Sequence, residues 1–295
     1  MIYSIENEFL KVEISGTGAE LRSIVGKKTG AEYLWQGNPD FWKNRATVIF
    51  PVCGRLEGGY YTYEGKRYEL PIHGFAKLAE YEETKKAADE IALTFRSDEE
   101  TKKAYPFDFS FTVTYTLDGS RIRQHYTVKN IGQGDLPFSL GGHPGFHVPF
   151  DKTEGEDFTD YFIEFPAECK ARCAVLSDRC FYTGKEADFP LKDGIRLPLR
   201  HDLFDHDAIF LSGTPESVTL RSKKNDRRIT VSFRDMTHLG FWHTAKAEAP
   251  FLCIEPWHGI PSTDGQIDDF ATKKELIHLP SGKTYETEIG IEIRE

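Results

Sequence analysis

The sequence predicts an all-β fold, a large antiparallel sandwich or barrel-like β-structure with very little helix. Apolar and polar residues alternate with a period of two along several stretches, and turn residues separate these stretches at short intervals. Aromatic residues make up 13% of the 295 residues, with 22 Phe and 13 Tyr. Such side chains suit the pleated, half-buried surface of a sheet.

The first half of the chain has one short hairpin signal and one weak helix signal. Residues 60–70 are expected to form a hairpin with Glu64-Gly65 at its turn. Residues 98–104 are expected to form at most a turn or two of helix, which Pro106 ends. Single strands are expected near residues 9–15, 18–25 and 90–97.

The strongest strand signal is a long hairpin over residues 107–129. Apolar residues alternate with polar ones on both sides of Asp118-Gly119, a dipeptide typical of tight turns. Later strands are expected near residues 160–165, 207–212, 217–222, 228–234, 250–255 and 283–293. Residues 1–295 are expected to form a single domain, because strand signals run from end to end without a linker, charge block or repeat.

Charge and composition exclude several classes of partner. The 47 acidic and 37 basic residues give a formal charge of −10, which opposes binding to nucleic acid and to anionic membranes. No basic region followed by an apolar core begins the chain, and no apolar run is long enough to span a bilayer. Five cysteines without paired C-x-x-C units suggest reduced thiols, so a cytoplasmic location is expected.

Three ionisable residues occur singly in segments rich in glycine, proline and aromatic residues. These are His73 in Pro-Ile-His-Gly-Phe, His143 in Gly-Gly-His-Pro-Gly-Phe, and Glu255 in Ile-Glu-Pro-Trp-His-Gly. Glycine lets the backbone approach a ligand closely, proline stiffens the segment, and an aromatic face can lie against a sugar. The pattern indicates acid–base chemistry on a small polar ring.

His143 and Glu255 are the candidate acid and base. Histidine titrates near neutrality and can deliver a proton to a ring oxygen, and we expect acidic neighbours to keep His143 protonated near pH 7. Glu255 ends an apolar strand, where a carboxylate is costly unless it has a partner or a task. The alternatives are a histidine hydrogen-bonded in a turn and a salt bridge at a strand end.

Four further residues are candidates for substrate binding. Arg55 and His73 lie at the two ends of the 60–70 hairpin, which would bring both to one cleft. Asp207 could accept hydrogen bonds from sugar hydroxyls or cap a turn, and Trp257 could stack on a sugar or pack in the core. For Arg55 the alternative is a surface ion pair with Glu57.

No metal or cofactor site is expected. His143 and His147 are four residues apart, but Pro144 and Gly145 argue against a helix, and on an extended strand they would lie about 13 Å apart. The remaining histidines lack a ligand pattern. Dinucleotide, P-loop and esterase-elbow motifs are absent from the sequence.

Taken in order, these motifs resemble the aldose 1-epimerases, or galactose mutarotase-like proteins, and within them the LacX-like branch. The resemblance covers essentially the whole chain and is carried by the following segments: Phe50-Pro-Val-Cys-Gly-Arg55, the Gly59–Leu70 hairpin with His73-Gly-Phe75, Gly142-His-Pro-Gly-Phe146, Leu203-Phe-Asp-His-Asp-Ala208 and Ile254-Glu-Pro-Trp257. It implies a β-supersandwich that interconverts the α- and β-anomers of an aldose without a cofactor.

The resemblance also implies residue roles. His143 corresponds to the general acid, Glu255 to the general base, His73 and Arg55 to substrate-positioning residues, and Asp207 to a sugar-binding aspartate. The segment around Arg55 differs from the motif of well-defined galactose mutarotases, which leaves the sugar open.

The substrate class is narrowed by charge. A related branch acts on hexose 6-phosphates, but no basic cluster adjoins these residues in the sequence, which favours a neutral aldohexose. A non-catalytic carbohydrate-binding protein and a lyase are competing interpretations, and the negative charge gives no support to a lyase acting on an acidic polymer. The oligomeric state is left open.

Overall fold

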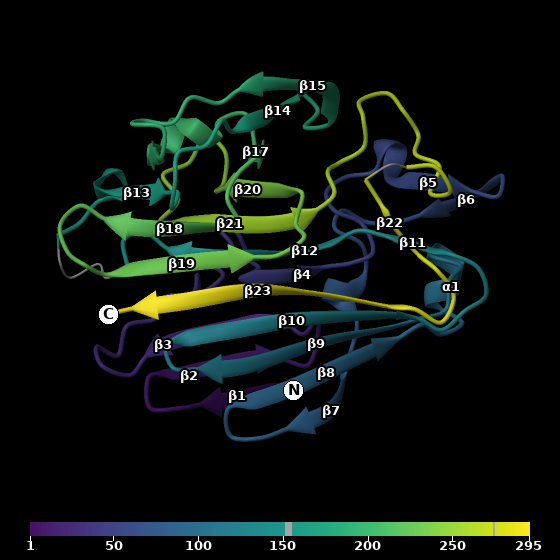
Figure 1. Cartoon of the computed structure of the whole chain (residues 1–295), viewed down its shortest axis with the longest axis horizontal. Coiled ribbons are helices and arrows are strands. Elements are labelled where there is room, and N and C mark those ends of the chain that lie inside the picture. The colour runs from purple at the N-terminus through teal and green to yellow at the C-terminus, as the bar shows by residue number, and fades with distance from the viewer. Residues whose placement is uncertain (151–154, 274) are drawn as a thin grey trace.

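Two large antiparallel sheets dominate the computed structural model, which describes residues 1–150, 155–273 and 275–295 (Figure 1). The all-β antiparallel prediction is confirmed. Within the described residues no helix has the length and apolar character that a bilayer-spanning segment needs.

The larger sheet has nine strands. Its spatial order is β16 (Arg196–Pro198), β13 (Tyr161–Glu164), β18 (Ser217–Ser222), β19 (Arg228–Phe233), β23 (Thr284–Arg294), β10 (Arg121–Asn130), β9 (Phe109–Asp118), β8 (Glu90–Arg96) and β7 (Glu82–Lys86). The C-terminal strand β23 therefore lies between β19 and β10, as its yellow ribbon shows in Figure 1.

The second sheet has seven strands and carries the candidate site. Its order is β15 (Tyr182–Asp188), β14 (Arg172–Leu176), β17 (Ile209–Ser212), β20 (His238–Trp242), β21 (Phe251–His258), β12 (Leu140–His147) and β4 (Ala46–Ile49).

Smaller elements complete the fold. One sheet joins β1 (Ile2–Glu6), β2 (Leu10–Ser15) and β3 (Leu21–Gly26), and two ribbons join β5 (Tyr60–Tyr63) with β6 (Lys66–Glu69) and β11 (Leu136–Phe138) with β22 (Ile277–Leu279). The helix α1 (Thr101–Ala104) is a single turn. Short three-ten turns are η1 (Glu57–Gly59), η2 (Ala76–Leu78), η4 (Phe158–Asp160) and η5 (His201–Phe204).

Both predicted hairpins are present. Strands β9 and β10 pair from Asp118 opposite Arg121, and the alternate residues of β9 are buried from Phe109 to Leu117. In the shorter hairpin β5 pairs with β6, and Glu64 and Gly65 have φ of 50° and 73°, the left-handed backbone of a two-residue turn. Period-two patterning therefore gave the correct buried face of β9 and β10.

Aromatic side chains fill the core between the two large sheets. Phe50, which follows β4, stacks on Phe111 of β9 with ring centroids 4.7 Å apart, and it also contacts Phe109 and Phe138. Leu252 and Ile254 of β21 belong to the same buried cluster. Since neighbouring residues of a strand point to opposite faces, Cys253 and Glu255 must lie on the outer face of the seven-stranded sheet.

Candidate active site

The candidate site lies on the outer face of the seven-stranded sheet, opposite the core. Period-two alternation sends Glu255 and Trp257 of β21, His143 of β12, Trp242 of β20 and Phe210 of β17 to this face. Loops from elsewhere in the chain add the remaining wall. The cavity has a volume of about 240 Å³ and is lined by Trp42, Asn44, Gly54, Arg55, Ile72, His73, Lys77, His143, Asp207, Ala208, Phe210, Trp242, Glu255, Trp257 and Pro261.

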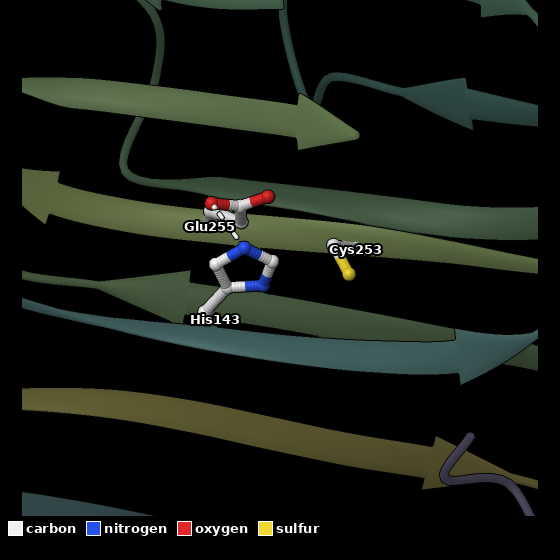
Figure 2. Close-up of side chains that lie close together, drawn as sticks. All are labelled: His143, Cys253 and Glu255. Atoms are coloured by element: carbon white, nitrogen blue, oxygen red, sulfur yellow. Dashed lines mark ion pairs between the residues drawn. The ribbon is translucent and has the colours of Figure 1, made fainter. Parts of the chain in front are cut away.

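Strand register brings His143 and Glu255 together. Gly141 pairs with Trp257 and Gly145 with Cys253, and this common register places position 143 opposite position 255. The two side chains point toward each other from neighbouring strands in Figure 2, with Nε2 of His143 3.3 Å from Oε2 of Glu255. On the other side of β21, Glu255 lies opposite Gly240, where an added Cβ would approach the Glu255 Cβ to 3.0 Å. Glycine at position 240 therefore leaves room for the side chain of Glu255.

Burial shifts the pKa values of this pair in opposite directions. Glu255 is 1% exposed, and burial followed by the negative charge of Asp207 raises the pKa of its carboxyl well above the ordinary value. His143 is 8% exposed, and burial lowers the pKa of its imidazole to about 3. The expectation of a protonated His143 near pH 7 is therefore wrong, because desolvation outweighs the attraction of Asp207. Between these two pKa values the pair holds one proton, on Glu255.

The ring of His143 is held between aromatic neighbours. Trp42 stacks on it with centroids 4.7 Å apart and an interplanar angle of 25°, while Trp242 and His73 meet it edge-on at 5.6 and 5.5 Å. These contacts fix the plane of the imidazole. They also exclude water from it, which explains the low pKa of His143.

His73 is fixed by a tight turn after the β5–β6 hairpin. Its backbone has φ of 63°, its N–H donates to the Gly54 carbonyl at 2.9 Å, and its Nδ1 accepts from the Gly54 N–H at 3.3 Å. Burial lowers the pKa of His73 well below the ordinary value, so the ring is neutral. Because Nδ1 is the acceptor, the ring proton lies on Nε2 and makes that atom a donor.

Arg55 and Asp207 form an ion pair at the cavity wall. Nη1 of Arg55 lies 2.9 Å from Oδ2 of Asp207, and the same nitrogen donates to the Cys180 carbonyl at 3.4 Å. The alternative pairing of Arg55 with Glu57 does not form, because Glu57 is bound by both terminal nitrogens of Arg179. Asp207 has φ of 80°, a left-handed backbone that Asp tolerates better than most residues.

Trp257 lines the cavity but is only 2% exposed. It packs on Phe210 with centroids 4.6 Å apart and meets His73 edge-on at 5.3 Å. Within the described residues its Nε1 has no hydrogen-bond partner, and neither do Nδ1 of His143 and Oε1 of Glu255. A buried polar atom without a hydrogen-bond partner destabilises the fold, so these three atoms are available to hydrogen-bond a polar ligand.

All six residues singled out from the sequence thus line one cavity. Sequence reasoning missed Trp42, Asn44, Lys77 and Trp242, which lie outside the motifs. For Lys77, the sequence offers one signal of a place in the site, which is its position three residues after the His73-Gly74 turn. His147 is not in the lining, and its ring instead meets Trp35 at 5.5 Å.

One set of side chains has the composition of a metal site. His143, Cys253 and Glu255 each offer a ligand atom, and these atoms lie within 4.8 Å of one another (Figure 2). A metal would need the thiolate and the carboxylate, because protonated groups do not ligate. Burial and the neighbouring Glu255 raise the pKa of Cys253 well above its ordinary value, so its chemistry here is that of a buried thiol.

Comparisons with known proteins extend over the whole chain. The family described as aldose 1-epimerase matches residues 1–290. The plasmid and chromosomal LacX proteins of Lactococcus lactis subsp. lactis are 32% and 31% identical over 283 residues, which is 89% of this chain and 89% of each relative.

Solved structures give the same result. A galactose mutarotase related enzyme from Lactobacillus acidophilus is 33% identical with a TM-score of 0.94, covering 100% of this chain and 98% of that chain. A galactose mutarotase-like protein from Lactobacillus casei ATCC 334 is 31% identical with a TM-score of 0.93, and the match covers 100% of both chains.

Proposed function

The chain belongs to the aldose 1-epimerase family, as its motifs predicted, and we propose that it interconverts the α- and β-anomers of an aldohexose by acid–base ring opening and closure. The observation that carries this proposal is the pair formed by His143 and Glu255, 3.3 Å apart in the cavity. The two oxygens that exchange protons in this reaction are both bonded to C1 of the sugar. An acid and a base must therefore lie side by side.

The reaction requires two proton transfers. The proton on the C1 hydroxyl leaves as the bond between C1 and the ring oxygen breaks, and the ring oxygen gains a proton. The open-chain aldehyde then turns about the C1–C2 bond and the ring closes on its other face with the transfers reversed. Each positioned transfer contributes about 10²–10⁴-fold, and the reaction already proceeds slowly in water.

Glu255 is the proposed base and His143 the proposed acid. For these roles the single proton of the pair must pass from Glu255 to Nε2 of His143 when sugar binds. Sugar hydroxyls that donate to the carboxylate favour this transfer, because hydrogen bonds to a charged form lower its free energy. Asp207 also favours a cationic His143. On ring closure the two residues exchange roles.

The other lining residues are proposed to orient the pyranose. His73 offers Nε2–H, Arg55 offers its remaining donors, and Asp207 offers its remaining acceptor positions to ring hydroxyls. Trp257 is buried against Phe210, so its indole N–H rather than the face of its ring is the group proposed to contact the sugar.

Substitution of the pair tests the proposal. His143→Gln and Glu255→Gln are each expected to lose nearly all turnover while remaining folded, as measured by polarimetry of freshly dissolved α-glucose and α-galactose. His147→Gln is the matched control, because His147 lies on the same strand outside the cavity lining. Wild-type rates in either variant would contradict the assignment. Sugar binding without any acceleration by the unaltered protein would instead support a carbohydrate-binding role.

A further inference from the structure

Among the residues that the structure describes, Lys77 lines the cavity without an acidic partner, whereas the other charged residues there are paired. Arg55 is paired with Asp207, and Glu255 lies beside His143. Lys77 also lines the cavity, but its Nζ donates only to the backbone carbonyl of Ile72, at 2.5 Å, and it forms no ion pair within the described part of the chain. It is a partly buried ammonium group without a carboxylate partner.

This cation faces an unfavourable environment. Taking an ammonium group out of water is costly unless an opposite charge compensates it. Burial lowers the pKa of Lys77, and the positive charge of the nearby Lys43 lowers it further. An anion bound at Lys77 would relieve both effects.

Lys77 is also close to the reacting groups. Its charge acts on the imidazoles of both His143 and His73. It belongs to η2 (Ala76–Leu78), which directly follows the turn that fixes His73, so the same short segment positions both side chains. A sugar held against His143 and His73 would therefore place one of its substituents within reach of Lys77.

We infer that Lys77 is a specificity-determining binding residue for an aldose that carries an anionic substituent, such as a phosphate or a carboxylate. This inference rests on the proposed anomer exchange, and it specifies that the substrate of that reaction is an anionic aldose. It revises the neutral aldohexose that the sequence favoured, because the basic residue that an anion requires comes from a segment that no motif marked. Arg55 does not serve this purpose, since Asp207 already neutralises it.

Anomer exchange can be measured by exchange NMR for glucose and galactose, for their 6-phosphates and for their uronic acids. The variants are Lys77→Met, which keeps the side-chain length without the charge, and Lys77→Arg, which keeps the charge. Lys66→Met, an exposed position in β6, is the matched control. A charge-assisted hydrogen bond corresponds to about a 10- to 100-fold effect.

We expect Lys77→Met to lower kcat/KM for at least one anionic series by about 10- to 100-fold more than it lowers kcat/KM for the neutral sugars, mainly through KM. Lys77→Arg should retain most of the activity toward the anionic sugar. A loss confined to the 6-phosphates identifies phosphate, and a loss confined to the uronic acids identifies a carboxylate. Equal losses on neutral and anionic sugars, or no loss on either, would overturn the inference and leave the proposed function intact. If the unaltered protein accelerates none of the sugars, both fail.

Discussion

His143 and Glu255 show how burial can separate the pKa values of two neighbouring groups. In water an imidazole binds a proton more tightly than a carboxylate does. In this cavity the order is reversed, because desolvation disfavours both the imidazolium and the carboxylate. Between these two pKa values the pair is therefore neutral, with its proton on Glu255, and the proposed mechanism requires bound sugar to shift that proton to His143.

The pH dependence of kcat/KM should reflect this reversal. The pair holds its one proton above the pKa of His143, about 3, and below the raised pKa of Glu255. We therefore expect kcat/KM to stay level between these two pKa values and to fall at the acid end of that range, where His143 takes up a second proton. Stopped-flow polarimetry across this range measures the profile, because kcat/KM reports groups of the free enzyme.

Circular dichroism at each pH separates this titration from acid unfolding. An inflection near pH 6.5, the ordinary pKa of histidine, would contradict the reversed order. So would an acid limb near the ordinary carboxyl value.

The residues that line the cavity could in part be identified from the sequence, but their electrostatics could not. Glycine, proline and aromatic neighbours marked His73, His143 and Glu255, because a side chain of this kind needs an unusual backbone around it. The aromatic enclosure by Trp42 and Trp242 and the approach of Lys77 depend on loops far away in sequence. Without them the protonation state of His143 was predicted wrongly.

Strand β12 illustrates which elements sequence patterns reveal. The alternation in β9 and β10 marks half-buried strands, and both were predicted closely. Strand β12 is buried along nearly its whole length and contains three glycines and a proline, so it has no alternation to detect. Strand β21 was expected to end near residue 255 but continues to His258, through Pro256. The candidate site therefore depends in part on a strand, β12, that alternation does not reveal.

Gly74 constrains the turn that positions His73, because its backbone is left-handed and packs closely against Phe50. Its φ is 68°, and an added Cβ would lie 2.3 Å from the Phe50 carbonyl oxygen. We expect Gly74→Ala to combine backbone strain with a clash against backbone, lowering the free energy of unfolding by about 3 kcal/mol. Urea unfolding measures the loss. Displacement of the adjacent His73 should also raise KM.

Gly65 provides the matched control for that substitution. It has φ of 73° in the β5–β6 turn, but nothing lies within 4 Å of an added Cβ. Gly65→Ala should therefore cost only the left-handed backbone strain, about 1 kcal/mol, with no change in KM. Equal losses in the two variants would mean that the close approach of Gly74 to Phe50 has no energetic role.

The arrangement of the two sheets places the core and the cavity on opposite faces of the seven-stranded sheet. The inner faces supply the aromatic core, whereas the outer face of the seven-stranded sheet carries the cavity. Strand order in these sheets was not predictable, because β10 pairs with β23 and β12 with β4, which are distant in sequence. Alternation determines the buried face of a strand but not its partner.

Glu255 connects the site to the stability of the whole molecule. A carboxyl whose pKa is raised in the folded state binds its proton more tightly there than in the unfolded chain. Between the unfolded and folded pKa values the folded state holds more protons, so the free energy of unfolding decreases as pH rises through that window. Glu255→Gln removes this term while keeping the shape of the side chain.

We therefore expect Glu255→Gln to be more stable than the unaltered protein by about 1 kcal/mol, or about 2–4 °C in Tm, at neutral pH. The gain should be small near pH 5 and larger at pH 8. The free energy of unfolding of the unaltered protein falls as pH rises, because Glu255 binds its proton more tightly in the folded state, whereas the glutamine of the variant does not titrate. The titration of His143 is common to both proteins and does not create the difference. Calorimetry at the two pH values measures it, with Glu83→Gln at an exposed position of β7 as the control. A loss of stability, or a gain that is the same at pH 5 and pH 8, would show that Glu255 is accommodated in its ionised form.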